Sequence, residues 1–208
     1  MVYSEKYKVL FVSVPKTGTT SLTASLVERL EGRRNQVPKG DTWVSVGEHW
    51  TLKQIAEVIG WDALNDVHIV GGVRNPWDRL VSSYNFYKNG RVAKLVRAGK
   101  QRNPKAIFNV MMAKLLPFKY WLRLYRTGAC FEYLCDGDGT LRADTVIRIE
   151  SMNEDVEALC QKLNVASFEP AVVNASSRKP YEEYYSSETR NIIARRFKAD
   201  LEHFNYSF

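Results

Sequence analysis

The chain has 208 residues, of which 45% are hydrophobic, so it is long enough to bury one substantial core. Its 30 lysines and arginines outnumber its 23 acidic residues, and the formal charge of +7 favours anionic partners such as nucleotides, sulfated or carboxylated glycans, nucleic acid or membrane headgroups. Every apolar run falls short of the ~20 residues that cross a bilayer, which excludes a membrane-spanning helix.

The first predicted unit is a strand followed by a turn and a helix. Residues 8–14 form a nearly continuous apolar run, which is typical of a strand covered on both faces. Leu22, Leu26 and Leu30 then recur at helical spacing. No small-residue cleavage pattern follows the apolar run, and the next residues have the composition of a phosphate loop. We therefore interpret this run as a strand and not as a signal-peptide core.

Two further strand-helix units follow along the chain. Residues 67–73 predict a second buried strand, and Asn75 as N-cap with Pro76 as first helical residue predicts a helix over residues 77–87. Residues 145–149 predict a third strand. After it, Ser151 and Glu154 form the pattern of a capping box, which predicts a helix that ends near Leu163.

The remaining segments predict helices. Residues 108–125 read as a helix that Pro117 interrupts, and we expect a helical insertion over about residues 88–140. One amphipathic helix near the C-terminus is predicted by Ile193, Phe197, Leu201 and Phe204. Strands separated by helices indicate an α/β fold, with a P-loop-like parallel β-sheet flanked by helices in a single domain over residues 1–208. Ligands bind such sheets beyond the carboxyl ends of the strands.

The turn after the first strand has the residue types of an anion cradle. It reads Val14-Pro15-Lys16-Thr17-Gly18-Thr19-Thr20-Ser21. Backbone amides at a helix N-terminus, a permissive glycine, a lysine and several hydroxyls together suit a phosphate group. The alternative is an ordinary tight turn in which Thr19 or Thr20 only caps the helix.

This loop departs from the nucleoside-triphosphatase pattern G-x-x-x-x-G-K-[ST]. Ser13 stands where that pattern has its first glycine, and Thr19 stands where it has its lysine. The individual residues of this loop therefore do not match those that bind phosphate and Mg²⁺ in a hydrolysis mechanism. A P-loop kinase or nucleotide hydrolase that uses Lys16 for phosphate and Glu150 for Mg²⁺ stays open as an alternative.

Two segments resemble the signatures of the sulfotransferases that use 3'-phosphoadenosine 5'-phosphosulfate (PAPS). Residues 11–22, FVSVPKTGTTSL, are similar to the family's loop for the 5'-phosphosulfate. Residues 73–84, VRNPWDRLVSSY, are similar to its second signature, which holds the 3'-phosphate. Both signatures in this order are far more specific than either alone. The likeness is greatest to the branch that includes carbohydrate sulfotransferases, and it extends more weakly through residues 181–208.

The resemblance implies the roles of the donor-site residues. Lys16 would stabilise the charge that builds on the leaving phosphate. The 5'-phosphate site would comprise Pro15, Lys16, Thr17, Gly18, Thr19, Thr20 and Ser21. Arg74 and Ser82, which lie two helical turns apart, would reach the 3'-phosphate. The alternative for Arg74 is a surface ion pair with Asp78.

A polar and basic stretch over residues 174–185 precedes the last helix. In the family a late basic loop closes over the donor nucleotide, and Arg178 and Lys179 match it loosely, because the glycine-rich pattern of the cytosolic members is absent. A solvated loop is the alternative for this stretch.

A histidine is the expected base for the acceptor hydroxyl, and the chain has only His49, His68 and His203. His49 stands just before a helix that Thr51 and Gln54 open as a capping box, and its position resembles that of a histidine in this branch of the family. We predict His49 as the base with Glu48 as its substitute. The alternative is that His49 is only a helix-entry residue. Core or surface roles are expected for His68 and His203.

The expected partners are a nucleotide donor, PAPS, whose product is adenosine 3',5'-diphosphate, and an acceptor hydroxyl on a glycan or a small molecule. We expect no metal requirement. Basic residues recur between Lys88 and Lys105 and would attract an anionic acceptor such as an acidic glycan, although a solvated face is the alternative. A basic nucleic-acid-binding protein is a further alternative, but the sequence shows no recognition module, so no nucleic-acid partner is expected.

The number and spacing of the cysteines indicate the cellular compartment of the protein. Cys130, Cys135 and Cys160 are an odd and widely spaced set, which fits neither a disulfide framework nor a zinc site. This usage predicts a reducing environment, and therefore a cytoplasmic protein.

Overall fold

The computed structural model describes residues 1–170 and 178–208. They form two compact units. Unit 1 comprises Met1–Arg74 and Cys130–Ser176, and unit 2 comprises Asn75–Ala129 and Ser177–Phe208. The single domain that the sequence predicts over residues 1–208 stays a prediction. Residues 174–177, which belong to the loop predicted to close over the donor, lie outside the described part of the chain.

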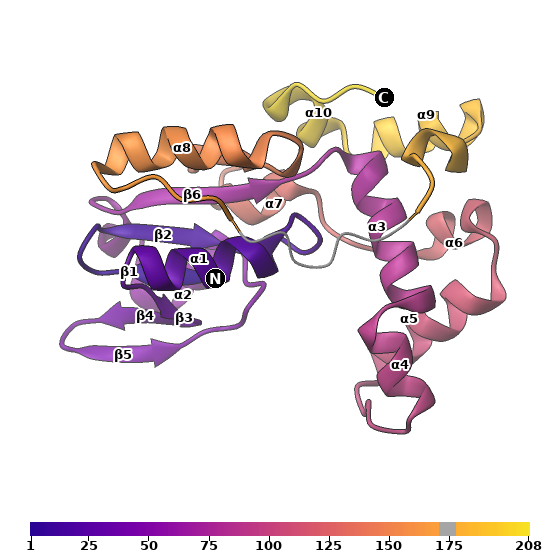
Figure 1. Ribbon diagram of the computed structural model, residues 1–208, viewed down its shortest axis with the longest axis horizontal. Coiled ribbons are helices and arrows are strands. Elements are labelled where there is room, and N and C mark those ends of the chain that lie inside the picture. Colours follow the sequence, from indigo (N-terminus) through magenta and orange to yellow (C-terminus); the bar gives the residue numbers. More distant parts are fainter. Residues whose placement is uncertain (171–177) are drawn as a thin grey trace. The chain divides into compact units, whose positions relative to one another are not determined.

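Unit 1 is built on a five-stranded sheet with the order β3-β1-β2-β6-β7. Its strands are β1 (Val2–Ser4), β2 (Val9–Val12), β3 (Arg33–Arg34), β6 (His68–Val73) and β7 (Thr145–Arg148). The three predicted strands pair in parallel, with Val9 opposite His68 and Val70 opposite Thr145. Figure 1 shows β2 and β6 side by side. The predicted α/β fold with a parallel sheet is thereby confirmed.

The sheet also has antiparallel strands that were not predicted. β1 pairs antiparallel with β2 on one side and with β3 on the other. A separate hairpin joins β4 (Gln36–Lys39) to β5 (Thr42–Ser45). The parallel strands therefore lie at the centre and at one edge of the sheet, and antiparallel strands complete the other edge.

Helices cover both faces of this sheet. α1 (Thr19–Arg29) and α8 (Met152–Leu163) share one core with the sheet. Its buried members are Val2, Val9, Phe11, Leu22, Leu26, Leu30, Val70, Ile147, Val156, Leu159, Cys160 and Phe168. α7 (Cys130–Leu134) packs on the opposite face, where Leu134 approaches Gly71, and α2 (Leu52–Ile59) packs on α7. Apolar cover on both faces explains why the central strands read as continuous apolar runs.

Unit 2 is helical. It contains α3 (Pro76–Asn89), α4 (Arg91–Arg97), α5 (Pro104–Leu115), α6 (Phe118–Leu124), α9 (Ser187–Arg196) and α10 (Lys198–Phe204). Aromatic contacts join α3 to α6, with Tyr84 and Trp121 ring centroids 5.3 Å apart. Buried Arg79 donates to the carbonyl of Gly128 at 2.8 Å, and Arg196 donates to the carbonyl of Tyr125 at 2.7 Å. These two arginines satisfy the carbonyls of the chain that leaves α6.

Several predicted helix ends are confirmed. The Asn75 side chain caps α3 by accepting from the amide of Trp77 at 3.1 Å, and Pro76 is the first helical residue. Thr51 and Gln54 form the predicted capping box of α2. Pro117 separates α5 from α6, as expected of a residue that cannot continue a helix.

Two predictions about helices are wrong. The capping box at Ser151 is absent, because the Ser151 hydroxyl donates to the Asp155 carboxylate at 3.1 Å and a 3₁₀ turn over Ile149–Ser151 precedes α8. The expected single C-terminal helix is divided into α9 and α10, because the backbone of Phe197, at φ −112° and ψ 31°, leaves the helical conformation. Two other 3₁₀ turns span Asp62–Leu64 and Tyr181–Tyr184. Within the described residues, no helix is both long and apolar enough to span a bilayer.

Candidate functional site

The loop between β2 and α1 has the backbone of an anion-binding turn. The Thr17 hydroxyl donates to the carbonyl of Val14 at 2.9 Å and closes the turn. Lys16 and Gly18 both have a left-handed backbone, with φ of 70° and 73°. Gly18 is the N-cap of α1, so neither Thr19 nor Thr20 is the N-cap residue of this helix. Amides at a helix N-terminus point away from the helix, so those of α1 are directed at this loop, and the Ser21 amide donates to the carbonyl of Gly18 at 3.1 Å.

Two glycines let neighbouring elements approach the loop closely. A Cβ atom on Gly72 of β6 would lie 2.8 Å from the Thr17 hydroxyl oxygen. A Cβ atom on Gly18 would lie 2.6 Å from the terminal methyl of Met152, which begins α8. Strand β6 and the start of α8 therefore support the loop from two sides, and Gly72 is a contributor that the motif analysis missed.

Arg74 lies at the carboxyl end of β6, next to the loop. Its side chain is half-buried, and its Nη1 donates to the carbonyl oxygen of Lys16 at 3.1 Å. Because β2 and β6 are parallel neighbours, their carboxyl ends meet at the same edge of the sheet. Arg74, near the start of the second sequence signature, is thereby joined to the first signature within unit 1. Asp78 forms an ion pair with Arg178.

His49 is oriented by a backbone atom of the strand end. Its Nδ1 lies 2.8 Å from the carbonyl oxygen of Ser13, in the residues between β2 and the loop. A carbonyl oxygen can only accept, so Nδ1 carries the hydrogen. In a neutral ring this leaves the lone pair on Nε2. His49 thus presents a basic nitrogen beside the phosphate loop, and the Ser13 carbonyl is a partner that sequence reasoning did not identify.

Glu48 is held as an ionised carboxylate. It accepts from Nη2 of Arg34 at 2.7 Å. Burial raises the pKa of Glu48, but the hydrogen bond from Arg34 and the nearby positive charge outweigh burial and leave this pKa below its ordinary value. A carboxylate with a lowered pKa is a weaker base, which disfavours Glu48 as the substitute for His49.

The other two histidines lie elsewhere. Nε2 of His68 lies 2.9 Å from the hydroxyl of Thr145 in the neighbouring strand, and burial lowers the pKa of His68. His203 is an exposed residue of α10 in unit 2. The expected structural role of His68 fits these contacts.

The remaining predicted donor residues belong to unit 2. Ser82 is a half-buried residue of α3. Arg178 forms an ion pair with Asp78, and the two side chains are only 12% and 17% exposed. Nη1 of Arg178 is buried and has no hydrogen-bond partner within the described residues. Lys179 is exposed and pairs with Glu183 at 3.0 Å.

A comparison with models of known protein families shows the family to which this chain belongs. The model of the sulfotransferase family matches residues 1–207. The chain belongs to the sulfotransferase family. No curated protein and no solved structure matches it. This member of the family is therefore a transferase, and the likeness to the carbohydrate-sulfotransferase branch stays a prediction.

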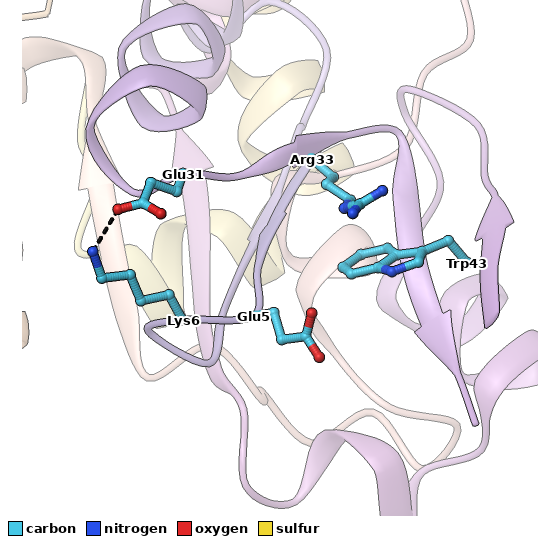
Figure 2. Close-up of a pocket in the computed structure, with 5 residues that line it drawn as sticks. All are labelled: Glu5, Lys6, Glu31, Arg33 and Trp43. Atoms are coloured by element: carbon cyan, nitrogen blue, oxygen red, sulfur yellow. Dashed lines mark hydrogen bonds and ion pairs between the residues drawn. The ribbon is translucent and has the colours of Figure 1, made fainter. Parts of the chain in front are cut away.

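The sulfotransferase has a cavity of about 370 Å³ that lies away from the phosphate loop. Figure 2 shows its lining residues, Glu5, Lys6, Glu31, Arg33 and Trp43, with the Arg33 guanidinium 4.2 Å from the centroid of the Trp43 ring. Since Ser4 of β1 pairs with Val9 at the start of β2, the residues after β1 lie at the opposite end of the sheet from the loop. None of the predicted site residues lines this cavity.

The cysteines and the possible metal ligands of the chain were compared with the sequence predictions. Cys130, Cys135 and Cys160 form no disulfide with one another, and Cys130 and Cys160 are buried. Across the described residues, no group of three or more His, Cys, Asp and Glu side chains is arranged to hold a metal ion.

Proposed function

We propose that this sulfotransferase moves a sulfuryl group from PAPS to the hydroxyl of a glycan or a small molecule. The hydrogen bond from Arg74 to the Lys16 carbonyl carries the proposal, because it joins the segment that resembles the 3'-phosphate signature to the loop that resembles the 5'-phosphosulfate signature. A donor with phosphates at both ends requires this proximity of two cationic segments.

The proposed reaction is an in-line displacement. The acceptor oxygen forms a bond to sulfur as the bond from sulfur to the bridging oxygen breaks, and adenosine 3',5'-diphosphate leaves. His49 accepts the proton of the acceptor hydroxyl at Nε2, the nitrogen opposite the one that donates to Ser13. Lys16 and the amides of the loop stabilise the charge that develops on the leaving phosphate. Glu48, with its lowered pKa, is the less favoured base.

Ser82, Arg178 and Lys179 are the donor-site residues that the sequence predicts in unit 2. Ser82 and Arg178 would bind the 3'-phosphate, and Lys179 would add positive charge. The support for Arg178 is its buried Nη1, which lacks a hydrogen-bond partner in the described part of the chain. A buried guanidinium donor without a partner is costly, and a phosphate oxygen would satisfy it.

Calorimetry with adenosine 3',5'-diphosphate tests the proposed function. We expect binding in the presence of a metal chelator, with affinity at least about tenfold higher than for ATP with Mg²⁺, because only the diphosphate has phosphates at both ends to meet Lys16 and Arg74. Binding of ATP with Mg²⁺ but not of the diphosphate would favour a kinase or hydrolase, in which Glu150 holds the metal. A labelled-donor screen over glycans, phenols, lipids and alcohols would then identify the acceptor.

Two adjacent glycines separate effects on the loop from effects on stability. In Gly72→Ala the new Cβ atom would meet the Thr17 hydroxyl, so we expect the loop to shift and the Kd for the diphosphate to rise about tenfold. Gly71→Ala is the matched control, because its Cβ atom would meet Leu134 on the other face of the sheet. It should lower the melting temperature but leave this Kd unchanged. Equal Kd values for the two variants would contradict the support that we assign to Gly72.

The proposal includes a cytoplasmic location, which rests on the cysteine usage of the sequence.

An acidic glycan is one acceptor that would suit the positive charge of the chain. The proposed reaction uses neither a metal nor a nucleic acid.

A further inference from the structure

Unit 2 contains a long segment that is exclusively basic among its charged residues. Residues 79–129 include no aspartate and no glutamate. The basic residues of this segment are Arg79, Lys88, Arg91, Lys94, Arg97, Lys100, Arg102, Lys105, Lys114, Lys119, Arg123 and Arg126. The chain as a whole has a charge of only +7, so its positive charge is concentrated here. A partner of this surface must be anionic.

Helix α5 presents a stripe of large apolar side chains to solvent. Phe108, Met111 and Leu115 are 59%, 53% and 72% exposed. They lie three and four residues apart and therefore share one face of the helix. Val110 and Ala113, on the opposite face, are fully buried in unit 2. The exposed stripe is thus not the face that packs α5 into its own unit.

Lysines border this stripe on both sides. At ~100° per residue, Lys105 and Lys114 lie about 90° on either side of the direction in which the stripe points. Both side chains are exposed, and neither forms an ion pair within the described residues. An apolar stripe between lysines is the pattern of a helix that lies in the surface of a bilayer, where the ammonium groups reach the lipid headgroups.

Helix α6 extends the same surface. Tyr120 and Leu124 are 50% and 57% exposed, and they lie one turn apart. A shallow depression joins α6 to α5 and is lined by Phe108, Asn109, Met112, Trp121, Leu124 and Tyr125. Lys119 lies beside these residues, with its Nζ 4.7 Å from the centroid of the Tyr120 ring. Arg123 is paired with Glu188, so the lysines carry the unpaired charge of this surface.

We propose that this α5–α6 surface, defined by the exposed side chains of Lys105, Phe108, Met111, Lys114, Leu115, Lys119, Tyr120 and Leu124, docks on bilayers that contain anionic phospholipids. An acidic glycan would use the lysines but would gain nothing from the exposed Phe108, Met111 and Leu115. A second copy of the same surface would bring two cationic faces together. A bilayer satisfies both features, because it offers hydrocarbon below a layer of negative charge.

Flotation of the full chain with lipid vesicles tests this proposal. We expect binding to vesicles of phosphatidylcholine with phosphatidylserine and not to vesicles of phosphatidylcholine alone. Replacing Phe108, Met111 and Leu115 together by serine should lower the partition coefficient at least about 100-fold, since three buried apolar side chains are lost. Lys105→Gln with Lys114→Gln should lower it about 20-fold.

A matched control removes the same charge elsewhere. Lys39→Gln with Lys53→Gln changes two exposed lysines of unit 1 and should alter vesicle binding less than about twofold. The single variant Leu115→Ser changes the most exposed of the apolar side chains. If the triple variant fails to fold, this single variant tests the proposal instead, and we expect it to lose less vesicle binding than the triple variant would. Equal binding to both kinds of vesicle, or equal losses for the two lysine pairs, would overturn the proposal. If the protein binds heparin, and if the serine replacements leave vesicle binding unchanged, the surface binds polyanions in general and the proposal is also overturned.

Discussion

His49→Ala is expected to lower the turnover number for sulfuryl transfer about 10³-fold, while the Kd for adenosine 3',5'-diphosphate changes less than about twofold. The reason is that the alanine lacks the Nε2 lone pair that His49 presents beside the loop, whereas the loop amides and Arg74 are untouched. Steady-state kinetics with labelled PAPS, together with calorimetry of the diphosphate, gives both quantities.

Three further variants isolate the base from its surroundings. His49→Asn retains a donor of similar reach for the Ser13 carbonyl but has no basic nitrogen, so it should be as slow as His49→Ala. Glu48→Gln loses the ion pair with Arg34 and should retain most turnover. His203→Ala, an exposed histidine of α10, should be unaffected. Normal turnover in His49→Ala would remove His49 from the mechanism, and a simultaneous loss in Glu48→Gln would transfer its role to Glu48.

Lys16→Met is expected to reduce the turnover number about 10²- to 10³-fold, because it removes the ammonium group that would stabilise charge on the leaving phosphate. The methionine keeps a side chain of similar length at the same left-handed backbone position, so the melting temperature should stay close to that of the native chain. Rapid-quench measurement of a single turnover separates this chemical step from product release.

Lys53→Met serves as the control, because Lys53 is an exposed lysine of α2 at which the same change should have no effect on turnover. A Lys16→Met enzyme with native single-turnover rate but weakened diphosphate binding would show that Lys16 only holds the nucleotide.

The central part of the fold could be predicted because its signals are local. The apolar runs that became β2, β6 and β7 are each continuous in sequence, and Asn75, Pro76 and Pro117 act on their immediate neighbours. β1 and β3 could not be predicted in this way. β3 consists of Arg33 and Arg34, which have no apolar pattern and are held by pairing with Val2 and Tyr3, residues that precede α1 in the sequence.

The candidate site was likewise predicted from local signals. The loop residues and Arg74 were predicted from short motifs, and the parallel pairing of β2 and β6 brings them together. The contact between His49 and Ser13 spans 36 positions and depends on the path of the chain around the β4–β5 hairpin, which no local pattern indicated. Ser151 was misread because Asp155, one helical turn further on, competes for its hydroxyl.

The partner that orients His49 belongs to the main chain, and this limits what mutational scanning would reveal. In many enzymes a carboxylate performs that task and can be exchanged for an amide to expose its contribution. Here every amino acid placed at position 13 would still offer the same carbonyl oxygen. A tolerant position 13 would therefore be compatible with a strict requirement for this hydrogen bond, and an ester substituted for the following peptide bond, which weakens the acceptor, would measure its worth.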